Sequence, residues 1–136
     1  MGQKVHPYGF RLGVNKTWVS SWCARRDYPA LLLEDIRLRH YITKTLSHAG
    51  ISKVEVERSA NRVRVDIHTA RPGIIIGKKG TEVDRLKTEL QKMINGKQVA
   101  LNIKEVRRAE LNATLVAQNV ALQLEKRISF RRAIYA

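Results

Sequence analysis

The sequence contains few of the residues that crosslink small domains, and it has no long hydrophobic run. Its 136 residues include one cysteine, Cys23, so the chain can form neither an internal disulfide nor a cysteine-based zinc knuckle. The longest apolar stretches, such as residues 31–33 and 73–77, are far shorter than the roughly 20 residues that a transmembrane helix needs. The amino terminus lacks the apolar core of a signal peptide. We therefore expect a soluble protein, with no membrane segment, from a reducing compartment.

Acidic residues are scarce as well. Only 12 Asp and Glu oppose 26 Lys and Arg, which gives a formal net charge of +14. Hydrophobic residues still make up 43% of the chain, an ordinary value for a globular protein that excludes disorder throughout. The surplus charge is spread along the sequence and predicts a polyanionic partner, for which nucleic acid is the first candidate. Simple solubility is the plainer alternative explanation.

Residues that could form a catalytic or metal site are not grouped. The four histidines, at positions 6, 40, 48 and 68, fall on separate predicted elements without metal-ligand spacing. Cys23 with a distant histidine is a formal nucleophile pair, but an incidental thiol is the simpler interpretation. Residues 73–78 resemble the opening of a nucleotide-binding P-loop, yet three residues separate the glycines instead of four, and Lys79 stands where a hydroxyl should bind magnesium. We predict no enzyme, no metal and no cofactor.

Hydrophobic periodicity predicts the order helix, strand, strand, helix, helix, strand, followed by a long helix. A first helix starts at Leu31 and stops at Gly50, and a hairpin with one apolar face follows, its alternating strands joined through residues 59–61. A short apolar turn at 74–76 precedes a helix that Thr81 should cap. The inward positions of that helix are expected to be Val83, Leu86, Leu90, Met93 and Ile94.

A third alternating strand contains Val99, Leu101 and Ile103, and the last long helix begins beyond Glu110. Its apolar stripe is expected to comprise Ala113, Val116, Ala117, Val120, Leu124 and Ile128.

A glycine loop, Gly77-Lys78-Lys79-Gly80, lies between two of the predicted helices. Glycines remove the Cβ atoms that would hold a sugar-phosphate backbone at a distance, the next helix offers free N–H groups, and the lysines supply charge. The Gly-x-x-Gly pattern alone is more often a surface turn. Its place after three isoleucines and before a helix favours a phosphate-binding loop.

The first 30 residues show neither a helical nor a strand period. Basic residues alternate there with the aromatic residues Tyr8, Phe10, Trp18 and Trp22. Such rings can stack on nucleobases while the cations hold phosphates, and they can equally pack onto the flank of the chain's own domain. Both interpretations stay open at this point.

The predicted αββααβ order together with the sequence Ile-Ile-Ile-Gly-Lys-Lys-Gly resembles a type II KH domain. Three separated segments also resemble the amino-terminal half of the bacterial-type small-subunit ribosomal protein S-three family; they are residues 1–7 (Met-Gly-Gln-Lys-Val-His-Pro), residues 68–73 (His-Thr-Ala-Arg-Pro-Gly) and residues 130–133 (Phe-Arg-Arg-Ala). Members of that family continue into a second α+β domain, whereas this sequence ends at Ala136, so we expect that half to be absent.

The resemblance implies an α+β fold with a three-stranded sheet and helices on one face. We expect an irregular basic extension at 1–30, the KH domain at 31–108 and a trailing helix at 109–136. The implied function is that of a structural ribosomal protein, cytoplasmic or organellar, which binds small-subunit rRNA in the head near the place where mRNA enters. Ribosomal proteins S-ten and S-fourteen would be its neighbours. A free-standing KH protein that binds single-stranded RNA as a regulator or chaperone is the alternative.

These expectations define a set of candidate site residues. The expected RNA-binding residues are Lys4, Arg11, Lys16, Arg62, Arg64, Arg71, Gly77, Lys78, Lys79, Gly80, Arg107 and Arg108. The family resemblance further implies that Arg131 and Arg132 face the incoming mRNA.

Overall fold

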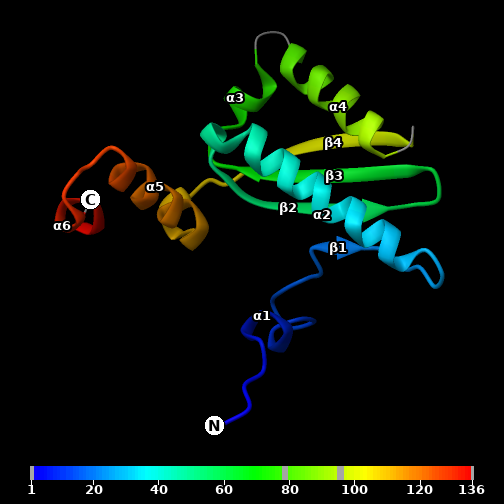
Figure 1. Ribbon diagram of the computed structural model, residues 1–136, viewed down its shortest axis with the longest axis horizontal. Helices are drawn as coiled ribbons and strands as arrows, with labels where there is room; N and C mark the ends of the chain where they lie inside the picture. The colour runs from blue at the N-terminus through cyan, green and yellow to red at the C-terminus, as the bar shows by residue number, and fades with distance from the viewer. Residues whose placement is uncertain (1, 78–79, 95–96, 136) are drawn as a thin grey trace.

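The computed structural model describes residues 2–77, 80–94 and 97–135, and its centre is a single mixed sheet (Figure 1). The strands lie in the order β1-β2-β3-β4, with bounds Ser20–Ser21, Ile51–Arg58, Arg62–Thr69 and Gln98–Glu105. Strands β2 and β3 are antiparallel, whereas β1 runs parallel to β2 and β4 runs parallel to β3. The predicted hairpin is therefore confirmed, and the sheet has one more strand than the three expected.

Helices α2 (Tyr28–Thr45), α3 (Pro72–Ile76) and α4 (Thr81–Met93) cover one face of this sheet (Figure 1). The other elements are short or peripheral: α1 (Pro7–Phe10), η1 (Ser47–Ala49), η3 (Ala109–Leu111), α5 (Ala113–Glu125) and α6 (Phe130–Tyr135). This arrangement agrees with the α+β fold of a type II KH domain.

The core lies between the sheet and these helices, as the alternating pattern of the strands predicts. Val63, Val65 and Ile67 of β3 point into it, and α2 and α4 contribute Leu38 and Leu90 among others. A bulge between Ile51 and Lys53 shifts the register of β2, so its buried residues are 51, 54 and 56 instead of a strict alternation.

Some predicted positions in the helical layer were wrong. Helix α2 begins at Tyr28, three residues before the expected start, because Pro29 is favourable in a first turn. The N-cap of α4 is Gly80, and Thr81 is the first helical residue. Met93, expected to point inward, is 39% exposed, while Leu86, Leu90 and Ile94 are buried as predicted.

The predicted long helix after residue 110 is divided. Helix α5 ends at Glu125, Arg127 adopts a left-handed backbone with φ 58°, and α6 begins at Phe130. The expected apolar stripe is mostly exposed, and among the residues of this segment whose burial the structure describes, Leu115 and Ala133 are buried. A stripe with helical spacing here does not mark a buried face.

The amino-terminal extension is more ordered than the sequence suggests. It contains the short helix α1 and the strand β1, which adds to the edge of the sheet next to β2. In Figure 1 the extension leaves the sheet at β1 and projects beyond it.

Candidate nucleic-acid interface

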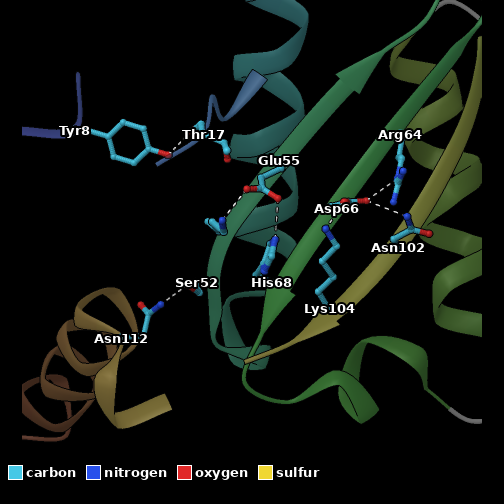
Figure 2. Close-up of polar contacts among 11 residues, drawn as sticks. Tyr8, Thr17, Ser52, Glu55, Arg64, Asp66, His68, Asn102, Lys104 and Asn112 are labelled. Carbon is cyan, nitrogen blue, oxygen red and sulfur yellow. Dashed lines mark hydrogen bonds and ion pairs between the residues drawn. The ribbon is translucent and has the colours of Figure 1, made fainter. Parts of the chain in front are cut away.

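The face of the sheet opposite the helices carries a network of paired charges (Figure 2). On β2, Glu55 accepts from Lys53 Nζ at 2.6 Å and lies 2.9 Å from His68 Nε2. On β3, Asp66 accepts from Lys104 Nζ at 2.7 Å, from Arg64 Nε at 3.1 Å and from the Asn102 amide at 3.0 Å. Each base drawn on this face therefore has an acidic partner within the chain.

The two carboxylates at the centre of this network are held ionised. Burial raises the pKa of Glu55, but hydrogen bonds from Lys53 and His68 outweigh that effect, and its pKa lies below the ordinary value. Burial likewise raises the pKa of Asp66, and the hydrogen bonds and charges of Lys104, Asn102 and Arg64 bring it below the ordinary value. The predicted RNA contact Arg64 is thus engaged with protein carboxylates.

A different set of cations gathers where β3 and β4 end. The two strands are parallel, with Thr69 opposite Glu105, so Arg71 and the pair Arg107 and Arg108 leave the sheet at the same end. The Val106 N–H donates to the Thr69 carbonyl at 2.8 Å and holds the two chain segments together. All three arginine residues are exposed, and within the described part of the chain none has an ion-pair partner. We call Arg71, Arg107 and Arg108 the basic end.

The glycine loop starts one short helix away from the basic end. Arg71 is the N-cap of α3, and α3 leads directly to Gly77. Gly77 has φ 66°, and a Cβ atom there would lie 2.6 Å from Cγ of Glu82, so both the backbone and the space require glycine. Gly80 has φ 80° and open space around it. Both glycines are therefore explained by backbone geometry, and they leave the two ends of the loop without a Cβ atom.

Lys78 and Lys79 lie outside the described residues. The first turn of α4 beyond them contains two carboxylates, Glu82 and Asp84. Negative charges at a helix N-terminus stabilise the helix by roughly 0.3–1 kcal/mol. They also mean that any phosphate at this loop shares the helix end with protein carboxylates, so lysine charge is needed there.

The remaining candidate residues are dispersed. Arg62 lies at the opposite end of β3 from the basic end, and Lys4, Arg11 and Lys16 are exposed on the amino-terminal extension. Arg131 and Arg132 are exposed on α6. The structure therefore brings together the basic end and the glycine loop, and leaves the extension and α6 as separate basic regions.

A hollow of about 540 Å³ lies between α2, α3 and α4, and no sequence pattern pointed to it. Tyr41 donates its hydroxyl to Glu89 at 2.5 Å across this hollow. That hydrogen bond, together with burial, raises the pKa of Tyr41. Arg85 lies 3.5 Å from the other oxygen of Glu89.

Sequence reasoning also missed a buried polar cluster around Asp35. This carboxylate is fully buried and accepts hydrogen bonds from Arg58 of β2 and from Ser20 and Trp22 of the extension. An aspartate in the middle of an amphipathic helix gives no sequence signal of burial, because its partners lie 13 to 23 residues away. Trp22 therefore packs against the domain. Of the two interpretations of the aromatic residues in the extension, packing onto the chain's own domain is the one that holds for Trp22.

Among the residues that the structure describes, no group of histidine, cysteine and carboxylate side chains could hold a metal ion. Over the same residues, no helix is both long enough and apolar enough to cross a membrane.

These features define a KH domain. The sequence model of the KH domain matches residues 37–111, and the chain belongs to the KH domain family.

Named relatives narrow the similarity further. The chain is 60% identical over 134 residues to a protein of Citrifermentans bemidjiense named small ribosomal subunit protein uS3, a match that covers 98% of this chain and 63% of the relative. Proteins of the same name from Geobacter sulfurreducens and Myxococcus xanthus are 59% and 58% identical, again over 98% of this chain and over 63% and 60% of the relatives. The chain thus spans less than two thirds of these relatives. The predicted resemblance to the ribosomal protein S-three family is confirmed, and the relatives' name denotes a protein of the small ribosomal subunit.

Proposed function

We propose that this chain binds small-subunit rRNA as part of a structural protein of the small ribosomal subunit. The observation that carries the proposal is the 60% identity, over 98% of the chain, to a relative named small ribosomal subunit protein uS3. The net charge of +14 supplies the attraction that phosphate binding needs. In this proposal the KH domain occupies residues 31–108, between a basic extension at 1–30 and a trailing segment at 109–136.

The basic end and the glycine loop are the first contacts in this proposal. Arg71, Arg107 and Arg108 hold phosphates, because they are exposed and have no competing carboxylate partner in the described part of the chain. Gly77 and Gly80 let the sugar-phosphate backbone approach the start of α4, and Lys78 and Lys79 supply the charge there. Arg62 and the extension's Lys4, Arg11 and Lys16 add contacts from other sides.

A finer proposal places the chain in the head of the subunit near the place where mRNA enters, with ribosomal proteins S-ten and S-fourteen as neighbours in cytoplasmic or organellar ribosomes. It is supported by the family resemblance and by the exposure of Arg131 and Arg132 on α6. Crosslinking from position 131 in reconstituted subunits tests it directly. Crosslinks to incoming mRNA are expected, and crosslinks confined to other parts of the subunit would contradict the placement.

The central test is cosedimentation of the tagged chain with small subunits, combined with a salt titration on an rRNA fragment. If about five phosphates are neutralised, log K against log salt should have a slope of about −3 to −4 on single strands. A flat salt response contradicts the electrostatic account. Equal affinity for unrelated single-stranded oligonucleotides, without cosedimentation, would instead favour the free-standing KH regulator.

A separate variant tests how much the glycine loop contributes to RNA binding. We expect Lys78→Asp with Lys79→Asp to weaken RNA binding by roughly tenfold or more while circular dichroism stays unchanged. The matched control is Lys87→Asp with Lys92→Asp, two exposed positions of α4 that make the same change in net charge. Equal losses for both pairs would mean that the loop acts only through overall charge.

A further inference from the structure

We propose that Asp35 is a positioning residue that holds the amino-terminal extension in the orientation in which its basic residues bind RNA; this inference rests on the proposed function above. Asp35 lies in α2 and has no exposed surface. Burial of a carboxylate is costly unless hydrogen bonds and a counter-charge compensate it. The hydrogen-bond partners of the Asp35 carboxylate show which segments of the chain it holds together.

One partner residue, Arg58, belongs to the domain, and two, Ser20 and Trp22, belong to the extension. Arg58 of β2 donates to Oδ1 through Nε at 2.8 Å and through Nη2 at 2.6 Å. The other oxygen, Oδ2, accepts from the Ser20 hydroxyl at 2.8 Å and from the Trp22 indole at 2.7 Å. Asp35 is therefore the joint between the extension and the domain.

Further hydrogen bonds around Asp35 fix the position of the extension on the domain. Arg58 also donates to Glu34 at 2.9 Å, and Arg39 donates to the Ser20 hydroxyl through Nη2. Beside the cluster, the Val56 N–H donates to the Val19 carbonyl at 3.0 Å, where β1 joins the sheet. A short strand of two residues has few hydrogen bonds of its own, so the side-chain cluster supplies much of what fixes it.

Further hydrogen bonds within the extension fix the positions of its basic residues relative to β1. The Tyr8 hydroxyl donates to the Thr17 carbonyl at 2.7 Å, which ties α1 to the segment just before β1 (Figure 2). The Arg11 guanidinium donates to the Pro7 carbonyl at 2.9 Å, and the Gly13 N–H donates to the Lys16 carbonyl at 3.1 Å. Arg11 and Lys16 thus have defined places relative to β1, and β1 has its place through Asp35.

Preorganisation predicts how Asp35 acts on RNA affinity. A fixed extension presents its cations at a high effective concentration once the KH domain is bound, whereas a loose extension must be ordered during binding. Asp35 then touches no RNA, and its effect exists only while Lys4, Arg11 and Lys16 are present. A residue that only stabilised the domain would change RNA affinity equally whether or not these three cations were present.

The experiment is a double-mutant cycle with an order measurement. The test variant is Ser20→Ala with Trp22→Phe, which removes the extension's two donors and leaves the Asp35–Arg58 ion pair intact; Asp35→Asn is the second variant, and Ser21→Ala on the exposed neighbouring serine is the control. Each is combined with an extension in which Lys4, Arg11 and Lys16 are changed to Gln. Affinity for a small-subunit rRNA fragment and the ¹⁵N heteronuclear NOE of residues 12–19 are measured for all of them.

We expect the test variant to lose about three- to tenfold in affinity in the native background and to lose nothing measurable in the neutralised background. The NOE of residues 12–19 should fall in the test variant and not in Ser21→Ala. Equal losses in both backgrounds, or an unchanged NOE, would overturn the inference and leave the proposed function standing. Absence of salt-sensitive RNA binding by the unmodified chain would overturn both.

Discussion

The face of the sheet opposite the helices, here called the open face, and the basic end both carry cationic side chains, but their cations differ in whether they are paired. The paired residues of the open face are Lys53, Glu55, Arg64, Asp66, His68 and Lys104. On the open face, Arg64 and Lys104 lie 3.1 Å and 2.7 Å from the carboxylate of Asp66. At the basic end, Arg71, Arg107 and Arg108 have no ion-pair partner within the described residues. A count of positive charges treats these residues alike, but a phosphate would meet a free cation in one place and a neutralised one in the other.

Paired and unpaired cations differ in the free-energy cost of binding a phosphate. A paired lysine that binds phosphate must give up a hydrogen bond to a carboxylate or bring that carboxylate's negative charge close to the phosphate. An unpaired exposed arginine gives up only water and counterions. The comparison therefore predicts that RNA affinity resides at the basic end and that stability resides on the open face.

The sharpest way to test the comparison removes the same charge from each region. Arg71, Arg107 and Arg108 changed together to Gln should lower RNA affinity by roughly 10- to 100-fold and reduce the salt slope by about 2. The matched variant changes Lys53, Arg64 and Lys104 to Gln and should lower affinity less than about threefold.

The same pair of variants should show the opposite order in stability. Loss of the open-face cations is expected to cost roughly 1–2 kcal/mol in urea unfolding, and loss of the basic-end cations roughly 0–0.5 kcal/mol. Equal RNA losses for the two triple variants would mean that pairing within the chain does not govern which cations bind.

A change of backbone without a change of charge probes the loop beside the basic end. Gly77→Ala should destabilise the fold by about 1–3 kcal/mol, because φ of 66° is strained for alanine and its Cβ would approach Glu82 at 2.6 Å. Gly73→Ala is the control, since that position in α3 has no atom within 4 Å of the added Cβ. It should be neutral or slightly stabilising. Thermal unfolding of both variants measures the difference, and equal values would contradict the described geometry.

Acid should lower the stability that the ion pairs of the open face contribute to the fold. The pKa values of Glu55 and Asp66 lie below their ordinary values in the folded protein. Groups of this kind contribute stability above the ordinary carboxyl pKa, and that contribution is lost as the pH falls through their lower folded pKa, here below about pH 4. Urea midpoints at pH 7, 4 and 3 should decline, and Glu55→Gln with Asp66→Asn should start lower and decline less. A parallel decline of both proteins would assign the acid sensitivity to other groups.

The smallest expected effect on stability concerns the helical layer, where a hydrogen bond to Glu89 fixes the Tyr41 side chain. Tyr41→Phe removes the hydroxyl that donates to Glu89 and should cost about 0.5–1.5 kcal/mol. Tyr8→Phe, which removes the exposed hydrogen bond to the Thr17 carbonyl, should leave domain stability within about 0.5 kcal/mol. Denaturant unfolding of the two variants checks the contrast, and RNA affinity should be unaffected by Tyr41→Phe.

Local patterns predicted the elements whose burial follows from local spacing. The hairpin of β2 and β3 and the inward side of α4 at Leu86 and Leu90 were confirmed, because periods of two and of three to four residues match these structures. The predicted apolar stripe that begins at Ala113 was wrong, since the helical period gives the orientation of a face but does not say whether anything covers it.

The candidate site was predictable only in part. The glycines of the loop carry a sequence signal, and the structure explains both of them by positive φ. The separation of free from paired cations, and the burial of Asp35, depend on side chains that meet across the sheet or across 13 to 23 residues of chain. No local pattern contains that information, so the basic end and the Asp35 cluster required the fold.

The parallel addition of β1 has a consequence for the order in which the protein folds. Ser20 pairs with Val56, far along the chain, whereas the hairpin of β2 and β3 closes through a short turn. Contacts between distant segments form late because loop closure costs entropy before the contact is rewarded. The edge of β2 must already exist before β1 can dock on it. We therefore expect changes at Ser20 to accelerate unfolding with little effect on the folding rate, as φ-values near zero would report.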